Sequence, residues 1–186
     1  SICVITCDAA RPCTDRVACP EGIGCQVVCE GPPGVCSSGV DCTKATSCLV
    51  NCRTEGSCAG KVSCGASTSS CEVRCNGKGS CQNEIACDAG NCDLHCEGVD
   101  SCSGKVGCGE ATNKCDVECE GTGSCKNEIA SDSPDTNVIC SPNTCAALIS
   151  CSGALCNLTC KNPSCGGGAC CKAAQCKLEG VENTCD

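Results

Sequence analysis

The stretch CEVRCNGKGSCQNEIAC, residues 71–87, contains the pattern that decides the fold. It opens with Cys71-Glu-Val73-Arg-Cys75, in which the cysteines and the valine stand at every second position. A short corner follows, and then Cys81-Gln-Asn-Glu-Ile85-Ala-Cys87 takes up the alternation again. Alternation with a period of two is typical of a β-strand whose alternate side chains face one interior. The stretch therefore predicts two short strands with cysteines and aliphatic side chains inside.

The first of these motifs, Cys-x-aliphatic-x-Cys, recurs every 20–23 residues along the whole chain. Its copies start at Cys3, Cys25, Cys48, Cys71, Cys92, Cys115, Thr136 (where Thr replaces Cys), Cys156 and Cys176. Their central aliphatic residues are Ile5, Val27, Val50, Val73, Leu94, Val117, Val138, Leu158 and Leu178. A fixed period of this length is the signature of a repeat architecture. We therefore treat residues 1–186 as a single repeat domain.

The second motif also recurs, with one aliphatic residue in each copy. These residues are Val17, Val40, Val62, Ile85, Val106, Ile129 and Ile149, weakening to Ala169 in the eighth copy. Two aliphatic residues cannot form a core within one repeat, which argues against an array of separate antiparallel hairpins. Stacked repeats share one core, so the sequence predicts an all-β protein without helices. It is a disulfide-rich β-solenoid (β-helix) of about nine coils, roughly 40 Å long at about 4.8 Å per coil.

Composition explains what replaces a conventional core. The chain contains 33 Cys among 186 residues and no Phe, Trp, Tyr or Met. A cysteine content above about 8–10% marks a disulfide scaffold, and such scaffolds form in oxidising compartments. We therefore expect a secreted protein at an extracellular or cell-surface location.

The sequence contains no run of about 18 apolar residues, so it predicts no membrane span. The absence of a leader after Ser1 is what a mature chain would show. The formal charge of −9 argues against nucleic acid and anionic membranes as partners.

The cysteine pairing can be inferred from one irregularity. The fourth cysteine of the sixth coil is replaced by Ser131, and the first cysteine of the seventh coil is replaced by Thr136. Two cysteines lost together are most simply two that bond to each other. We therefore expect the fourth cysteine of each coil to bond the first of the next, and the second to bond the third. A different combination between the facing strands of one coil is the alternative.

The rule gives fifteen disulfides. Second-to-third bonds are expected at Cys7–Cys13, Cys29–Cys36, Cys52–Cys58, Cys75–Cys81, Cys96–Cys102, Cys119–Cys125, Cys140–Cys145 and Cys160–Cys165. Fourth-to-first bonds are expected at Cys19–Cys25, Cys42–Cys48, Cys64–Cys71, Cys87–Cys92, Cys108–Cys115, Cys151–Cys156 and Cys171–Cys176. Cys3, Cys170 and Cys185 remain. Either Cys3 and Cys185 bond each other between molecules, or Cys170 bonds Cys185 and leaves Cys3 free.

Two further columns of side chains follow from stacking the second motif. The outward position before the aliphatic residue alternates in charge through Lys61, Glu84, Lys105 and Glu128. Such a ladder favours in-register stacking. One position earlier, glycine and asparagine alternate through Gly60, Asn83, Gly104 and Asn127. We expect this position to face inward, with each asparagine amide reaching backbone of a neighbouring coil.

The sequence offers little for catalysis or cofactor binding. Neither Cys-x-Cys nor Cys-x-x-Cys occurs, so metallothionein-like clusters, zinc knuckles and thioredoxin-type redox pairs are disfavoured. The single histidine, His95, falls on the outward register of a predicted strand and is expected to be an ordinary surface side chain. Asn157-Leu-Thr159 fits a glycosylation sequon but lies within a predicted strand. We therefore expect no enzymatic activity, no cofactor and no metal, and the sequence identifies no glycan or protein ligand.

The regular cysteine spacing, with small and polar residues between, resembles the disulfide-braced β-solenoids, among them the beetle-type antifreeze proteins. That resemblance implies ice binding, yet the scattered residues Thr43, Thr54, Thr122 and Thr159 do not form the Thr-x-Thr array of those proteins. The repeats Cys-Glu-Gly-x-x-Ser-Cys and Cys-x-Gly-Lys-Val-x-Cys are similar to Cys-rich, aromatic-free bacterial surface proteins. For those, the resemblance implies a cell-surface location without a defined activity.

The predicted first strand begins two residues into the chain, and the ninth coil stops at Cys185. No segment predicted as a cap covers either end, although open solenoid ends expose strand edges. One end could then pair with the other end of a second copy, which would propagate as a filament. We expect a structural protein, the subunit of an extracellular filament or surface layer that polymerises end to end. The alternatives are a monomeric adhesive or binding rod on the cell surface, and an ice-binding protein.

Overall fold

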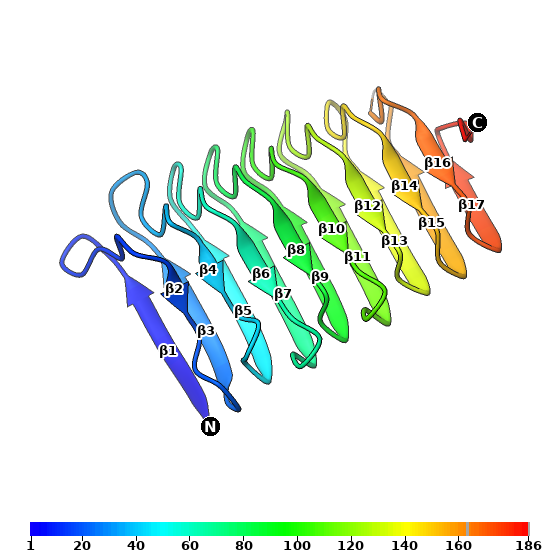
Figure 1. Ribbon diagram of the computed structural model, residues 1–186. Coiled ribbons are helices and arrows are strands. Elements are labelled where there is room, and N and C mark those ends of the chain that lie inside the picture. Colours follow the sequence, from blue (N-terminus) through cyan, green and yellow to red (C-terminus); the bar gives the residue numbers. More distant parts are fainter. Residues whose placement is uncertain (163, 186) are drawn as a thin grey trace.

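The computed structural model describes residues 1–162 and 164–185 and is a β-solenoid in which two strands per coil stack into two parallel sheets (Figure 1). The sheet of first strands contains β1 (Ile2–Cys7), β3 (Gly24–Cys29), β5 (Ser47–Cys52), β7 (Ser70–Cys75), β9 (Asn91–Cys96), β11 (Lys114–Cys119), β13 (Asp135–Cys140), β15 (Leu155–Cys160) and β17 (Gln175–Glu179). The sheet of second strands contains β2 (Val17–Ala18), β4 (Val40–Asp41), β6 (Val62–Cys64), β8 (Ile85–Cys87), β10 (Val106–Cys108), β12 (Ile129–Ser131), β14 (Ile149–Cys151) and β16 (Ala169–Cys171). The all-β solenoid expected from the sequence is confirmed, and the residues described contain no helix.

Each strand pairs with its equivalent one coil away, and equivalent residues lie side by side. In the first sheet, Cys71 pairs with Cys92 and Val73 pairs with Leu94. In the second sheet, Val62 pairs with Ile85. Parallel strands need a crossover connection, and here the rest of the coil provides it. The register of the repeat in the sequence is therefore the register of the sheets.

The core lies between the two sheets. The aliphatic residues of both motifs are 0–1% exposed in most coils, among them Val50, Leu94, Ile85 and Ile129. The cysteines that flank them are also buried, whereas the residues between them are partly or fully exposed, as in β9 and β11. This alternation confirms that cysteines and aliphatic residues form the inward set. At the two ends, Ile5 and Leu178 are only partly buried.

In seven of the eight coils, the corner before the second strand contains a cysteine in the left-handed region. The third cysteine of seven coils has φ between 45° and 57°, for example 53° at Cys81 and 45° at Cys102. This region costs a residue with a Cβ atom roughly 1–2 kcal/mol. Glycine stacks at the same corner: a Cβ atom on Gly98 would lie 2.2 Å from the carbonyl oxygen of Gly77. At Gly98 the close approach of the two coils therefore leaves no room for a Cβ atom.

The charge ladder on the second sheet forms as expected. Lys61 Nζ lies 2.6 Å from Glu84 Oε2, and Lys105 Nζ lies 2.9 Å from Glu128 Oε2. The hydrogen bond from Lys105 to Glu128, reinforced by their opposite charges, raises the pKa of Lys105 above its ordinary value. These ion pairs link equivalent positions of successive coils and therefore favour the observed register.

The asparagine column was predicted to face inward, and this prediction is wrong. Asn83 and Asn127 are both exposed. Strand β8 begins only at Ile85, after the left-handed Cys81, so the strand alternation does not extend back through the corner. The expected contact with backbone nevertheless forms, because Asn83 Nδ2 donates to the Ala59 carbonyl oxygen at 2.7 Å and Asn127 Nδ2 does the same toward Ser103 at 2.6 Å.

Candidate functional site

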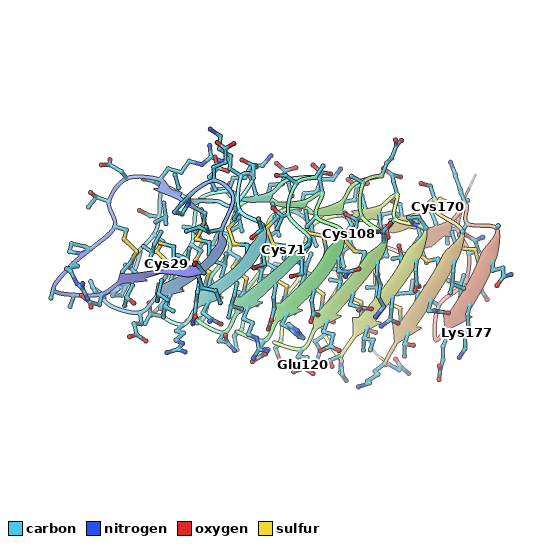
Figure 2. The ribbon with its side chains drawn as sticks, turned by 90° about the horizontal axis from the view of Figure 1, so that it is seen from below. Cys29, Cys71, Cys108, Glu120, Cys170 and Lys177 are labelled. Carbon is cyan, nitrogen blue, oxygen red and sulfur yellow. A yellow bond between two sulfur atoms is a disulfide. The ribbon has the colours of Figure 1, made fainter. Side chains whose placement is uncertain are left out.

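Disulfides line both edges of the core along the length of the solenoid (Figure 2). All fifteen pairs expected from the Ser131 and Thr136 irregularity are bonded in the structure. Every one of these bonds bridges a corner of five to seven residues in sequence separation. Sixteen disulfides in one chain, the sixteenth being Cys170–Cys185, indicate folding in an oxidising environment.

The sulfur atoms of neighbouring coils also contact one another. Cys19 Sγ and Cys42 Sγ lie 3.5 Å apart, although each is bonded to another partner. Groups of three cysteine sulfurs within 4.8 Å recur along the chain, for example Cys19, Cys42 and Cys48. In that group Cys42 and Cys48 form a disulfide, and a metal ligand must instead be a thiolate. Such groups are therefore stacked disulfides rather than a thiolate site.

The last coil ends differently from the others. After β17 the chain returns beside β16, where Asn183 forms a parallel bridge with Ala169. The Asn183 side chain donates to the Cys171 carbonyl oxygen and accepts from the Cys171 amide, both at 3.1 Å. Two residues later, Cys185 bonds Cys170, with Cα atoms 4.6 Å apart. Of the two alternatives left open by the sequence, the structure has the bond between Cys170 and Cys185.

Cys3 is the one cysteine without a disulfide partner. It lies in β1, level with Cys25 of β3, and its side chain is partly exposed. The neighbouring residues Ile2 and Val4 lie on the outer face and are 68% and 60% exposed, respectively. Among the residues described, β1 pairs only with β3 and β17 pairs only with β15 in the sheet of first strands. Each of these two strands therefore presents one unpaired edge.

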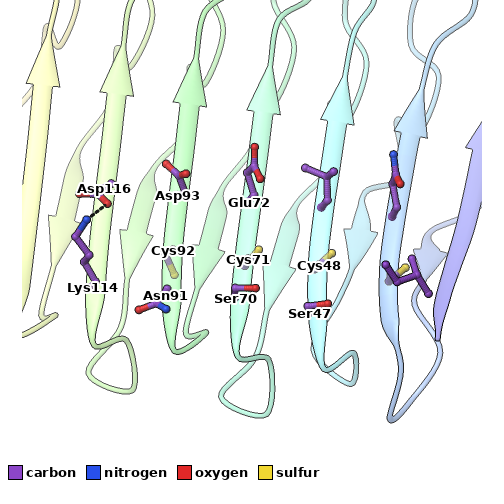
Figure 3. A pocket seen from close by; sticks show the side chains of 14 residues that line it. Ser47, Cys48, Ser70, Cys71, Glu72, Asn91, Cys92, Asp93, Lys114 and Asp116 are labelled. Atoms are coloured by element: carbon purple, nitrogen blue, oxygen red, sulfur yellow. Dashed lines mark hydrogen bonds and ion pairs between the residues drawn. The ribbon is translucent and has the colours of Figure 1, made fainter.

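The outer face of the first sheet carries a shallow groove of about 460 Å³ (Figure 3). Ser47, Ser70, Asn91 and Lys114 form one row of its lining. Leu49, Glu72, Asp93 and Asp116 form the next row. Lys114 Nζ lies 2.5 Å from Asp116 Oδ2, and this hydrogen bond raises the pKa of Lys114. The groove is open and lined by both polar and apolar groups, and it collects more acidic than basic side chains.

His95 lies on this outer face, as expected, in strand β9. Its side chain is 19% exposed, because carboxylates lie on two sides of the ring. His95 Nε2 lies 3.0 Å from Asp93 Oδ1, and His95 Nδ1 lies 3.1 Å from Glu118 Oε2 of the next coil. The histidine thus links two adjacent coils through their acidic side chains. No nucleophile adjoins it in these contacts, and Cys96 next to it is bonded to Cys102.

The sequon residue Asn157 lies within β15, level with Asn137 and Lys177 of the neighbouring strands. Its side chain is partly buried. Sequence reasoning placed it in a strand, and the structure agrees. Nothing in this placement distinguishes Asn157 from the other outward residues of the sheet.

No known protein family model matches the chain, and no match was found among curated proteins or among solved structures. The resemblance to other disulfide-braced β-solenoids is therefore one of architecture. Within residues 1–162 and 164–185, no helix is long and apolar enough to span a membrane.

Proposed function

We propose that this protein is a secreted structural protein, the subunit of an extracellular filament or surface layer that assembles end to end through the edges of its first sheet. The observation that carries the proposal is that β1 and β17, which belong to the same parallel sheet, each have one unpaired edge within residues 1–162 and 164–185. These strands lie at opposite ends of the solenoid (Figure 1). A contact between two different surfaces of identical copies can repeat without closing, and it then produces a filament.

The residues on the two edges match one another. If β1 of a second copy paired with β17 in the register used elsewhere, Cys3 would lie beside Cys176 and Ile5 beside Leu178. Ile5 and Leu178 are partly buried, while their equivalents within the solenoid are fully buried. Addition of a strand would cover both side chains and give each edge its backbone partners. End-to-end pairing therefore satisfies the same contacts that hold successive coils together.

The rest of the molecule suits a load-bearing role outside the cell. Sixteen disulfides fix nearly every corner, and a secreted location provides the oxidising conditions that they need. The outward positions carry ion pairs between coils rather than an enclosed cavity lined with apolar side chains. Binding sites for small molecules are usually concave and mostly apolar. We accordingly propose no enzymatic activity and no cofactor.

A second candidate, a monomeric adhesive or binding rod, is favoured by the groove of the first sheet. A partner with basic groups would fit Glu72, Asp93 and Asp116. Ice binding has less support, because the same face carries the charged side chains Arg74 and Glu118 on either side of His95. A binding rod or an ice-binding protein would remain monomeric in a solution of the pure protein, whereas a filament subunit would form polymers.

Negative-stain electron microscopy of the oxidised 186-residue chain, without added residues, tests the proposal. Ser1 and Cys7 accept hydrogen bonds from β3 through their carbonyl oxygens, so the backbone groups of Val4 point toward the open edge. Val4→Pro removes an amide donor from that edge and should abolish filaments, while the control Val4→Thr should retain them. If the unmodified chain forms only separate molecules, each a single solenoid, the proposal is contradicted. Thermal hysteresis in that sample would instead support ice binding.

A further inference from the structure

We propose that the joint between two copies is sealed by thiol–disulfide exchange, in which Cys3 of one copy attacks the Cys170–Cys185 disulfide of the next. The inference rests on the end-to-end pairing proposed above and assigns the covalent step of that assembly. The inference is drawn from the positions of three cysteines at the two ends of the solenoid. Cys3 has a free thiol, and Cys170 and Cys185 form the sixteenth disulfide.

Cys185 lies at the corner that holds the fourth cysteine of the eighth coil. Asn183 bridges Ala169, two residues before Cys171, and Cys185 is bonded to Cys170, the residue before Cys171, with Cα atoms 4.6 Å apart. Cys171 is the fourth cysteine of the eighth coil, and it bonds Cys176, the first of the ninth. Cys185 is not bonded to a first cysteine. It bonds Cys170 instead, at the position between the two inward residues Ala169 and Cys171.

Cys3 occupies the level of a first cysteine. It pairs in register with Cys25, which bonds the fourth cysteine of the first coil, Cys19. Fourth-to-first bonds join Cα atoms 5.9–6.3 Å apart at every such corner, as in Cys19–Cys25 and Cys64–Cys71. If β1 of a second copy pairs with β17, its Cys3 stands beside Cys176, where the first cysteine of a tenth coil would be. Cys3 of one copy then lies at the same corner as the Cys170–Cys185 disulfide of the other, next to the fourth-to-first bond Cys171–Cys176.

The exchange needs no oxidant, because one disulfide replaces another. The Cys3 thiol loses its proton, and its sulfur attacks Cys185 Sγ of the neighbouring copy. A bond forms between Cys3 and Cys185, the bond between Cys185 and Cys170 breaks, and Cys170 leaves as a thiolate that takes up a proton. The disulfide under attack is reachable, since Cys170 and Cys185 are partly exposed, whereas a bond such as Cys96–Cys102 is fully buried. Each copy keeps one free thiol, which moves from Cys3 to Cys170.

The test is to identify which cysteine carries the free thiol before and after filaments form. Unpolymerised chain and filaments are prepared under argon, alkylated with iodoacetamide in denaturant, digested without reduction, and mapped by mass spectrometry. The unpolymerised chain should be alkylated at Cys3 and contain the Cys170–Cys185 peptide pair. Filaments should be alkylated at Cys170 and contain Cys3 joined to Cys185. Filaments with Cys3 still alkylated, or with Cys3 joined to Cys176, overturn the exchange and leave the proposed filament standing, whereas a sample without filaments overturns both.

Two variants separate the covalent step from pairing of the edges. Cys3→Ser should still form filaments in the microscope, but in detergent they should dissolve to single chains instead of the ladder expected from the unmodified protein. Cys170→Ser leaves Cys185 as a thiol, so its cross-link to Cys3 should fail under argon and return when an oxidant such as diamide is added. A ladder from Cys3→Ser, or an argon-resistant ladder from Cys170→Ser, would overturn the inference.

Discussion

The hydroxyl oxygens of Ser131 and Thr136 lie 2.7 Å apart, at the one corner where the fourth-to-first disulfide of this solenoid is replaced by a hydrogen bond. Both residues are buried, at 2% and 0% exposure. Ser131 pairs in register with Cys108 and Cys151, and Thr136 with Cys115 and Cys156. The two hydroxyls therefore stand between two intact disulfides, Cys108–Cys115 and Cys151–Cys156. A pair of polar side chains thus makes the contact that a cystine makes in the neighbouring coils, and the strand register is kept.

The double variant Ser131→Cys with Thr136→Cys should form a seventeenth disulfide. Its neighbours bridge Cα atoms 6.2 and 6.1 Å apart, so the backbone already has the geometry of a bonded corner. A bond that closes a loop this short should raise the free energy of unfolding by about 2 kcal/mol. Guanidinium denaturation under non-reducing conditions measures the change. The single variant Ser131→Cys is the control and should gain nothing, since it adds a thiol without a partner.

Alanine at Gly98 should destabilise the stack of coils. Its Cβ atom would lie 2.2 Å from the Gly77 carbonyl oxygen, which is backbone and cannot move without separating two coils. Overpacking of this kind costs roughly 1–3 kcal/mol. Gly107→Ala is the matched control, because its Cβ atom would meet nothing closer than the Ile85 carbonyl oxygen at 3.9 Å. Denaturation midpoints of the two variants should differ, and equal midpoints would show that the glycine column does not set the coil spacing.

Much of this architecture could be predicted because the spacing of the repeat in the sequence is also the register in which the strands pair. Equivalent residues stack, so the spacing of Cys71, Val73 and Cys75 predicts both the inward set and the strand partners. The disulfide pairing was inferred from Ser131 and Thr136, since two cysteines replaced together are most simply two that bond to each other, and these two side chains do contact each other. The ion pairs of the second sheet followed from the alternation of Lys61 and Glu84.

What the sequence did not predict lies at corners and ends, where strand alternation no longer applies. The outward turn of Asn83 depends on the left-handed backbone of Cys81, and nothing in the residue type signals that conformation. The return of residues 183–185 beside β16 depends on a contact between Asn183 and Cys171 that has no counterpart in the other coils. A shortened last coil could have been suspected from Gly180, which stands where a cysteine is expected.

Reversal of charge at Lys105 should weaken the ladder of the second sheet. Lys105→Glu would place a carboxylate beside Glu128 and near Glu84, whereas Lys105→Gln only removes the attraction. Because the pair is about half exposed, the loss should be no more than about 1 kcal/mol. The difference between the two variants should shrink in about 1 M salt, where the Debye length falls to about 3 Å.

The same pair sets a dependence on pH. Glu128 raises the pKa of Lys105 in the folded protein, so the stabilisation is fully present below the ordinary lysine pKa of about 10.4. It is lost as the pH rises through the folded-state value. Stability of the unmodified protein relative to Lys105→Gln should thus be constant near neutral pH and decline only in strong alkali. If this stability difference began to decline near pH 7, a group other than Lys105 would be responsible for the pH dependence.

The left-handed corner gives the sharpest comparison, because the two ends of one disulfide respond oppositely to glycine. Cys81 has φ of 53°, whereas its partner Cys75 lies in the extended strand β7. With the bond removed as Cys75→Ala and Cys81→Ala, changing residue 81 from alanine to glycine should recover about 1 kcal/mol, since glycine adopts positive φ without a Cβ clash. The same change at residue 75 should cost about 0.5–1 kcal/mol, because glycine weakens a strand. Denaturation of the three double variants in parallel measures both effects against one reference. If glycine shifted stability in the same direction at both positions, the corner conformation would not be what distinguishes them, and the cost assigned to the seven left-handed cysteines would be wrong.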